Sequence, residues 1–263
     1  MFEDIKGRAA LVTGSTSGIG LHMAEALASM GCAVTLNGLG DEAEIETARS
    51  GLEERYGVTV RYDGANLMDG AECERLVRDA EAAHGKLDIL INNAGMQKVS
   101  PIDEFDDAAW DRIVALNLTA VYRTTKAALP GMKTRGFGRV VNVASAHGLV
   151  ASPFKAPYVA TKHGVVGFTK SVALETAEAG VTVNALCPGY VLTPLVEDQL
   201  ADTAKARGMT EEQVKNDVML KAQPTKRFVT YEQLAGMVLY LASDAGGSCT
   251  GAAYTVDGGW TAQ

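Results

Sequence analysis

A tyrosine and a lysine four residues apart, Tyr158 and Lys162, form the pair in this chain best suited to acid–base chemistry. They fall in a helical pattern, where residues at that spacing share one face. A phenol has a pKa of about 10 and is a poor base near neutral pH, but a nearby ammonium group favours its phenolate form. The pair alone means little, because Tyr and Lys also occur at this spacing on solvated helices.

Other polar residues near this pair favour a catalytic interpretation. Ser145 ends the strand-like run 140–145, thirteen residues before Tyr158, and the Asn-Asn-Ala-Gly segment 92–95 ends another such run. Asn117 stands between two leucines in a long helical pattern, where a buried amide needs hydrogen-bonding partners.

A glycine-rich segment follows the first strand-like run directly. Residues 13–20 read Thr-Gly-Ser-Thr-Ser-Gly-Ile-Gly and lead into a helical pattern. Such glycines let the backbone approach a pyrophosphate, and the helix that follows offers it unpaired N–H groups. The Gly-x3-Gly-x-Gly spacing differs from the common dinucleotide fingerprint. A cofactor loop is the favoured interpretation, and a plain tight turn is the alternative.

The elements that must position these residues alternate between strand and helix. The predicted strands are 8–13, 33–36, 58–61, 88–91, 139–144, 181–186 and 253–256, and the predicted helices are 18–30, 41–56, 69–84, 108–135, 158–179 and 231–243. Several strands are apolar on both faces, as expected where helices cover both sides of a parallel sheet. The pattern predicts an α/β fold, with one doubly wound, Rossmann-like domain over 1–263 and a mainly parallel seven-stranded sheet.

One segment interrupts this alternation. Residues 188–227 follow the sixth predicted strand and have the character of a loop with one or two short helices. A long insertion after a strand in a compact α/β domain is often a lid over the site. We expect a substrate lid, with surface decoration as the alternative.

Composition limits the classes of partner. The formal net charge is -8 and no long block of Lys or Arg occurs, which disfavours nucleic acid and anionic membranes as main partners. The short polar N-terminus lacks an apolar signal core, and no apolar stretch is long enough to span a bilayer. The cysteines and histidines show neither disulfide-like nor metal-ligand spacing, so no metal is expected. A cytoplasmic location is the default expectation.

The second predicted strand ends where such folds choose between NAD and NADP. Residues 36–41 contain no Arg or Lys, and Ser17 rather than a basic residue precedes Gly18. A 2′-phosphate would lack a cationic partner, which favours NAD. The acid that often binds the adenosine ribose is also missing at Asn37, so the preference for NAD rests on an absence of positive charge.

Over essentially its whole length, the chain resembles the short-chain dehydrogenase/reductase family. That family carries a TGxxxGIG loop, an NNAG segment, a helical Asn, a Ser and a YxxxK pair, all present here in order and spacing. The resemblance implies that Tyr158 takes the proton of a substrate hydroxyl while hydride passes to the nicotinamide. Lys162 would hold the nicotinamide ribose and depress the pKa of Tyr158. Ser145 would bind the reacting oxygen, and Asn117 would fix a proton-relaying water; these four residues are called the tetrad below.

The resemblance also implies the residues that bind the cofactor, NAD. They are Gly14, Ser15, Thr16, Ser17, Gly18, Ile19, Gly20, Asn66, Leu67, Asn93, Ala94, Gly95, Tyr158, Lys162, Pro188, Gly189, Val191 and Thr193. The family further implies a homotetramer, in which the helices predicted over 108–135 and 158–179 supply paired faces.

Four polar residues around the tetrad could converge on one anion. Lys155 would supply a positive charge, and Gln97, His147 and Gln199 would supply hydrogen bonds. Each of them alone could be a merely solvated residue. Lys155 stands only three residues before Tyr158, which suits a carboxylate two carbons from the reacting carbinol.

Within the family, the chain is similar to bacterial D-3-hydroxybutyrate dehydrogenases in its SASAHGLVAS, TLNGLGDEAEIE and DGGWTAQ segments. The similarity implies reversible, NAD-dependent oxidation of D-3-hydroxybutyrate to acetoacetate. The substrate-binding residues would be Gln97, Ser145, His147, Lys155, Tyr158, Gln199 and Trp260. The chain departs from the subfamily at two positions. Asn66 replaces an acid often found near the adenine, and Tyr190 stands where Trp is frequent, which bears on the alkyl end of the pocket.

Two alternatives stay open at this point. The first is another activity of the same family, such as reduction of a 3-oxoacyl thioester or oxidation of a sugar alcohol; a preference for NADPH and indifference to Lys155→Ala would support it. The second is a non-catalytic dinucleotide sensor. Such sensors typically lose the Tyr or the Lys of the tetrad, and this chain keeps both.

Overall fold

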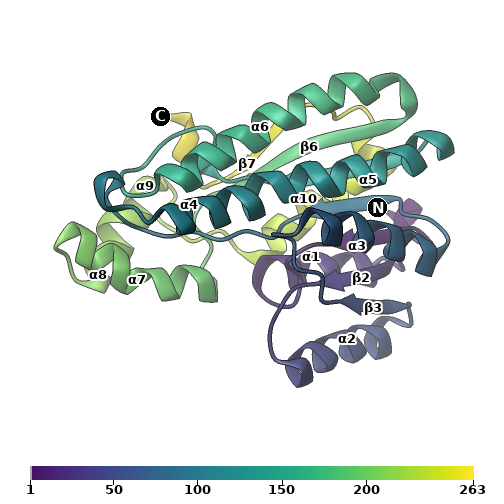
Figure 1. Ribbon diagram of the computed structural model, residues 1–263, viewed down its shortest axis with the longest axis horizontal. Helices are drawn as coiled ribbons and strands as arrows, with labels where there is room; N and C mark the ends of the chain where they lie inside the picture. The colour runs from purple at the N-terminus through teal and green to yellow at the C-terminus, as the bar shows by residue number, and fades with distance from the viewer. Residues whose placement is uncertain (1) are drawn as a thin grey trace.

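Seven short strands form one parallel sheet in the computed structural model of the chain (Figure 1). They are β1 (Ala9–Val12), β2 (Ala33–Asn37), β3 (Val60–Asp63), β4 (Ile89–Asn92), β5 (Gly138–Val143), β6 (Val181–Pro188) and β7 (Ala253–Val256). Their order is β3-β2-β1-β4-β5-β6-β7. The structure describes residues 2–263, except for the side chains of residues 194, 195, 198 and 199. The predicted doubly wound α/β fold is confirmed.

Ten α-helices are described between and after these strands. They are α1 (Gly18–Ser29), α2 (Glu42–Tyr56), α3 (Gly70–His84), α4 (Asp107–Val114), α5 (Ala120–Arg135), α6 (Ala156–Thr176), α7 (Pro194–Arg207), α8 (Glu211–Gln213), α9 (Leu220–Ala222) and α10 (Tyr231–Ala242). None of the helices in the described part of the chain is long and apolar enough to cross a membrane.

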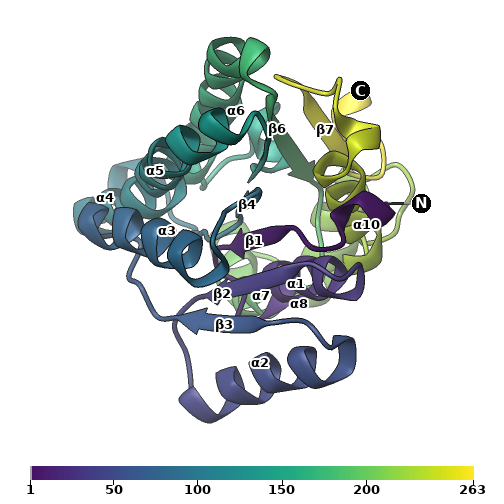
Figure 2. The same cartoon turned by 90° about the vertical axis from the view of Figure 1, so that its right-hand side faces the viewer.

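Helices cover both faces of the sheet, which explains why its central strands are mostly apolar. Every residue of β1, β4 and β6 is buried. Figure 2 shows α3, α5 and α6 on one side of the sheet and α1 and α10 on the other. Two apolar clusters result, one between α1, α10 and the sheet and one between α3, α5 and the sheet. A strand buried on both faces is therefore mostly apolar, and the buried Asn92 of β4 is hydrogen-bonded to Thr125 and Asn142.

The sequence of strand pairing creates a crevice where the site residues are expected. From β1 the chain moves outward to β2 and β3, and β4 then returns to the other side of β1. The connections at the carboxyl ends of β1 and β4 therefore leave in opposite directions. In open α/β sheets, ligands bind in the crevice at this reversal point.

Some predicted element boundaries need correction. The strand predicted over 58–61 lies at 60–63, and the helix predicted over 108–135 is α4 and α5 joined by a π-helical segment at Ala115–Thr119. The insertion after β6 holds more helix than predicted. It contains the 14-residue α7 and a second run made of α8, a π-helical segment at Val214–Met219, and α9.

The start signals of the insertion helices were present in the sequence. Thr193 caps α7 by accepting a hydrogen bond from the Val196 N–H, and proline occupies the first turn, where its fixed φ suits a helix. Thr210 and Gln213 form a reciprocal capping box at the start of α8.

Candidate active site

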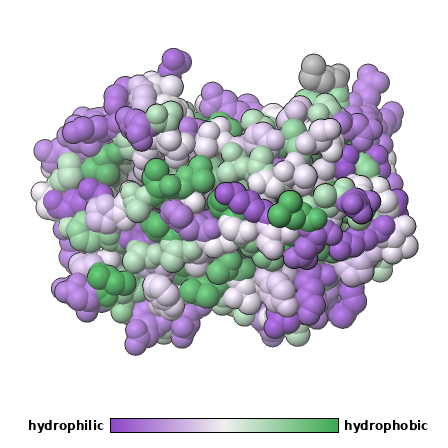
Figure 3. All heavy atoms as spheres, turned by 90° about the horizontal axis from the view of Figure 1, so that it is seen from above, coloured by the Kyte–Doolittle hydropathy of each residue, from purple (hydrophilic) through white to green (hydrophobic). Residues whose placement is uncertain are grey.

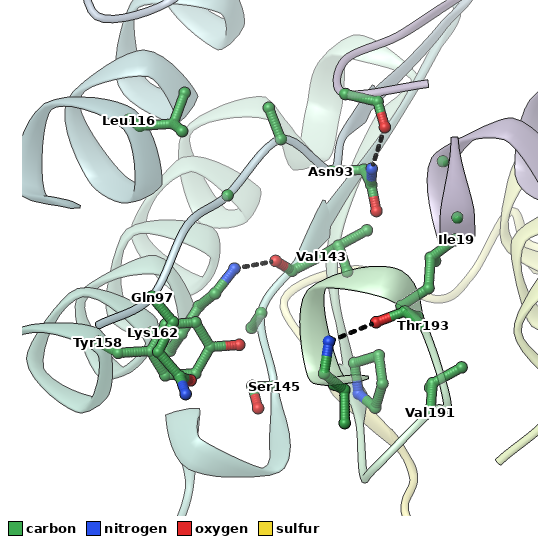
Figure 4. Close-up of a pocket in the computed structure, with 18 of the residues that line it drawn as sticks. Ile19, Asn93, Gln97, Leu116, Val143, Ser145, Tyr158, Lys162, Val191 and Thr193 are labelled. Atoms are coloured by element: carbon green, nitrogen blue, oxygen red, sulfur yellow. Dashed lines mark hydrogen bonds between the residues drawn. The ribbon is translucent and has the colours of Figure 1, made fainter. Parts of the chain in front are cut away.

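A cavity of about 440 Å³ opens at the carboxyl ends of the strands, and most of the predicted site residues line it. These are Gly14, Thr16, Ser17, Gly18, Ile19, Gly20, Asn66, Leu67, Asn93, Ala94, Gly95, Gln97, Ser145, His147, Lys155, Tyr158, Lys162, Pro188, Gly189, Val191, Thr193 and Trp260. In Figure 4, Tyr158, Lys162 and Ser145 lie close together on one side of this pocket, and Ile19 and Val191 lie across it.

Two predicted residues do not line the cavity, and the side chain of a third is not described. Ser15 is fully buried, and its hydroxyl donates to the Val12 carbonyl, so it shapes the loop without lining the cavity. Asn117 is also fully buried beneath the cavity wall. The side chain of Gln199 lies outside the described residues, so its predicted role in substrate binding stays a prediction.

The glycine-rich loop presents an uncapped helix end to the cavity. Gly14 and Gly18 adopt φ values of 59° and 56°, a region that glycine occupies without strain. The N-cap residue of α1, Ser17, makes no side-chain capping bond, whereas Asp41 caps α2. The first N–H groups of α1 are therefore available to an anion, and the positive end of the helix dipole adds to the attraction.

Close backbone packing holds this loop in shape. A Cβ added at Gly20 would collide with the Gly14 carbonyl and lie 2.5 Å from Asn93 Nδ2. That amide donates to the carbonyls of Thr13 and Gly14 at 3.1 and 2.9 Å. The segment after β4 thus anchors the loop after β1, and only glycine fits at position 20.

Asn37 and Gly38 line the far end of the cavity, where the sequence lacks the usual ribose-binding acid. Asn37 is buried, and its Nδ2 donates to the carbonyls of Asp63 and Ala65, so this side chain holds the loop after β3. A Cβ at Gly38 would lie 2.5 Å from Thr16 Oγ1.

Two exposed apolar side chains, Leu39 and Met68, also line this end of the cavity. They were not predicted, because an apolar residue in a loop carries no signal of its own. Their exposure leaves a flat apolar rim suited to an aromatic ring system.

The tetrad side chains meet in a buried environment. Lys162 Nζ donates to the Val143 carbonyl at 2.7 Å and lies 5.6 Å from the centre of the Tyr158 ring. Burial lowers the pKa of Lys162 to about 8. Burial also raises the pKa of Tyr158, and a hydrogen bond with the Ser145 side chain opposes this effect. The sequence predicted that Lys162 lowers the pKa of Tyr158. In the protein alone the pKa of Tyr158 is raised, because the effect of burial is larger than that of the hydrogen bond.

Both polar atoms of the Asn117 amide form hydrogen bonds that fix the segment after β4. Its Oδ1 accepts from the Met96 N–H and its Nδ2 donates to the Met96 carbonyl, both at 2.8 Å. It lies in the π-helical segment between α4 and α5, and such bulges are frequent at functional sites. The amide expected to need partners has them, and the water-fixing role stays a prediction.

A buried lysine marks the other end of the cavity. Lys155 is only 5% exposed, and burial together with the charge of Arg207 lowers its pKa to about 8. His147 is also buried, which lowers its pKa to about 3, so it is neutral and acts as a hydrogen-bonding group. One of its ring nitrogens lies 2.9 Å from Ser152 Oγ.

Aromatic rings close this end of the cavity. Tyr190 and Trp260 stack with ring centres 5.0 Å apart, and the His147 ring meets Trp260 edge-on at 4.9 Å. Lys155 Nζ lies 5.5 Å from the centre of the Tyr190 ring. The arrangement offers one cation, neutral polar groups and an apolar wall, which suits a small carboxylic acid with a short alkyl end.

Comparison with known proteins agrees with this geometry. The family model described as short chain dehydrogenase matches residues 8–204. The chain is 52% identical to a D-beta-hydroxybutyrate dehydrogenase of Rhizobium meliloti strain 1021, over 97% of this chain and 99% of the relative. It is 50% identical to a D-beta-hydroxybutyrate dehydrogenase of Cupriavidus necator, over 98% of this chain and 100% of the relative.

Among solved structures, a variant of actinorhodin polyketide ketoreductase with NADPH superimposes with a TM-score of 0.91. Its sequence is 38% identical, and the match covers 97% of this chain and 98% of that one. Sequence, fold and cavity agree, and the chain belongs to the short-chain dehydrogenase family.

Proposed function

We propose that this enzyme oxidises D-3-hydroxybutyrate to acetoacetate with NAD, reversibly. The observation that carries the proposal is the buried Lys155, which lines the same cavity as Tyr158 and Ser145. A buried ammonium without a carboxylate partner is unfavourable unless a ligand supplies the negative charge. The two relatives named D-beta-hydroxybutyrate dehydrogenase, each about half identical over the full chain, support the same substrate.

The chain's residues fit a nicotinamide dinucleotide. The uncapped first turn of α1 and the glycines beside it suit the pyrophosphate, and the apolar rim at Leu39 and Met68 suits the adenine. Lys162 would hold the ribose next to the nicotinamide. The bound dinucleotide would supply the acceptor for the hydride that leaves the carbinol carbon.

The residues of the tetrad bind the reacting oxygen and accept its proton. Ser145 holds the substrate hydroxyl by a hydrogen bond, and Tyr158 Oη accepts its proton. Positive charge beside the phenol, from Lys162 and from the oxidised cofactor, lowers the raised pKa of Tyr158 towards the working range. Asn117 acts through Met96 by fixing the segment after β4, and so is a positioning residue.

The carboxylate of the substrate would lie against Lys155, with His147, Gln97 and Gln199 as hydrogen-bonding groups. The insertion over 188–227 would act as the lid. Val196 of α7 and Met219 of the π-helical segment line the cavity, which supports that role. A lid that excludes water strengthens the attraction between ammonium and carboxylate.

We propose NAD as the cofactor because the adenosine end of the cavity presents no cation to a 2′-phosphate among its described lining residues. The residues nearest this end, Gly38, Leu39 and Met68, are all uncharged. An NADP-dependent enzyme would be expected to place Arg or Lys there.

The direct test is absorbance at the NADH band with each enantiomer of 3-hydroxybutyrate, with NAD and in parallel with NADP. We expect NADH to form with the D enantiomer and NAD. Faster turnover with NADPH and a 3-oxoacyl thioester or sugar substrate would favour the other activities of the family. Cofactor binding without turnover of any alcohol would favour a sensor.

We also propose a homotetramer in the cytoplasm. Figure 3 views the molecule from the side of α6 and shows apolar patches between polar ones. Leu174 of α6 is 82% exposed, and Tyr122 of α5 and Trp110 of α4 are partly exposed, which suits burial against another copy. Sedimentation should give four times the 27.7 kDa chain mass, and a monomer at micromolar concentration would contradict the assembly.

The cytoplasmic location is supported by the cysteines. All four are free thiols, as is usual in a reducing compartment.

A further inference from the structure

We propose that Arg207, at the end of α7, is a specificity-determining residue that makes closure of the lid depend on a negatively charged substrate. The proposal rests on the proposed function, because it assumes that the cavity receives a carboxylate. The proposal adds Arg207, a residue of the lid, to the residues that recognise the substrate carboxylate. The reasoning starts from the loop that joins Ser145 to α6.

Phe154 in that loop has an unusual backbone conformation. Its φ is 69°, in the left-handed region, where a bulky residue other than glycine is strained. Its carbonyl accepts a hydrogen bond from the Ser100 N–H at 3.0 Å, which holds the turn in place. The next residue is Lys155, whose side chain lines the cavity and is 5% exposed. The strained turn thus directs the lysine inward and leaves the Phe154 ring beside it.

The lid contacts this ring through a second cation. The guanidinium carbon of Arg207 lies 5.9 Å from the centre of the Phe154 ring, within the range of a cation–π contact. The charge of Arg207 is close enough to lower the pKa of Lys155. Arg207 is not one of the residues that line the cavity, but it brings a positive charge near the carboxylate end from an element that is distant in sequence.

Neither cation has an anionic partner among the described side chains. Among the side chains that the structure describes, no carboxylate forms an ion pair with Lys155 or Arg207. The other titratable groups that face Lys155 are His147 and Tyr190, and both are neutral because burial lowers the pKa of the first to about 3 and raises that of the second to about 12.

The seated lid consequently holds two like charges near each other, with no ion pair to either of them among the described side chains. Their repulsion opposes closure over an empty or neutral site, and a substrate carboxylate turns the repulsion into two attractions. Arg207 is half-buried, so water and salt screen part of the effect. The protein would therefore close preferentially over an acid.

A simpler role for Arg207 is to stabilise the helix end, since a cation in the last turn interacts favourably with the helix dipole. Lys205 stands in the same last turn, is exposed, and shares that role. It makes no described contact with the loop around Phe154. K205Q is thus the matched control for R207Q, and R207K keeps the charge while changing the group that carries it.

Binding of butyrate, an acid without the reacting hydroxyl, tests the idea without turnover. Its affinity for the NAD complex would be followed by Trp260 fluorescence in a W110F background, because these are the two tryptophans of the chain. At pH 7 and low salt we expect R207Q to weaken butyrate about threefold, in line with a partly exposed charge pair, and K205Q to leave it unchanged. R207K should retain most of the affinity, and salt should reduce the difference.

The pH dependence separates an electrostatic role from a structural one. Lys155 holds the carboxylate while protonated, so butyrate affinity should fall as pH rises past its pKa of about 8. Without Arg207 the pKa of Lys155 rises, and the fall should begin at a higher pH in R207Q only. Equal affinities and equal pH profiles for R207Q and K205Q would overturn the proposal, as would an absence of butyrate binding to the parent protein. Butyrate binding that depends on Arg207, without oxidation of D-3-hydroxybutyrate, would keep it and reject the proposed substrate.

Discussion

Replacing Tyr158 by Phe should leave NAD binding nearly unchanged and reduce kcat for D-3-hydroxybutyrate by about a thousandfold. The side chain is deep in the cavity next to Ser145, and only its hydroxyl is lost. General acid–base groups contribute about 10²- to 10⁴-fold to rates, which sets the size of the loss. Steady-state kinetics and titration with NAD would measure the two effects separately.

The control for this variant is Tyr190→Phe, which removes a hydroxyl from a buried tyrosine that lines the same cavity. Its ring would still stack on Trp260. We expect kcat to change far less in this control than in Tyr158→Phe. A near-normal kcat for Tyr158→Phe would reject Tyr158 as the proton acceptor.

Replacing Lys155 by Ala should raise KM for D-3-hydroxybutyrate much more than it lowers kcat. A hydrogen bond to a charged group is worth about 1.5–3 kcal/mol, which corresponds to roughly a 10- to 100-fold increase in KM. The ammonium is distant from the proton transfer in this scheme, so its loss removes binding that the ground state and the transition state share. Initial rates over a wide range of substrate concentration would separate KM from kcat.

The methyl ester of 3-hydroxybutyrate provides the control, because it keeps the carbinol and lacks the negative charge. Its kcat/KM should differ little between the parent enzyme and Lys155→Ala. Loss of activity towards acid and ester alike would indicate a structural lesion. An unchanged KM for the acid would remove Lys155 from the carboxylate site.

Much of this site was predictable because its chemistry lies in short sequence segments next to recognisable strands. Tyr158 and Lys162 share a helix face, and Lys155 lies three residues away, so the chain itself keeps them together. The sheet was predictable for a similar reason. Strands such as β4 begin with a run of apolar residues that are buried on both faces, which is typical of a strand in a covered sheet.

The remaining features depend on contacts that the sequence does not reveal. Leu39 and Met68 are ordinary apolar loop residues until the fold brings both to one rim. The π-helical turn at Asn117 differs from α-helix by a shift in hydrogen-bond register, which leaves no mark on hydrophobic spacing. Asn37 lines the cavity and also donates from its Nδ2 to the loop after β3, and the sequence does not show which groups a residue at a strand end faces.

The glycine-rich loop and the rim at Leu39 form two parts of the cavity that differ in how readily their residues can be substituted during evolution. Backbone atoms of Gly14 and Gly20 pack so closely that this half tolerates almost no substitution. The other half includes the exposed apolar side chains of Leu39 and Met68. A lineage could therefore exchange one dinucleotide for another through positions 39 and 68 while its catalytic apparatus stays untouched. Descendants with new coenzyme preferences should differ there first.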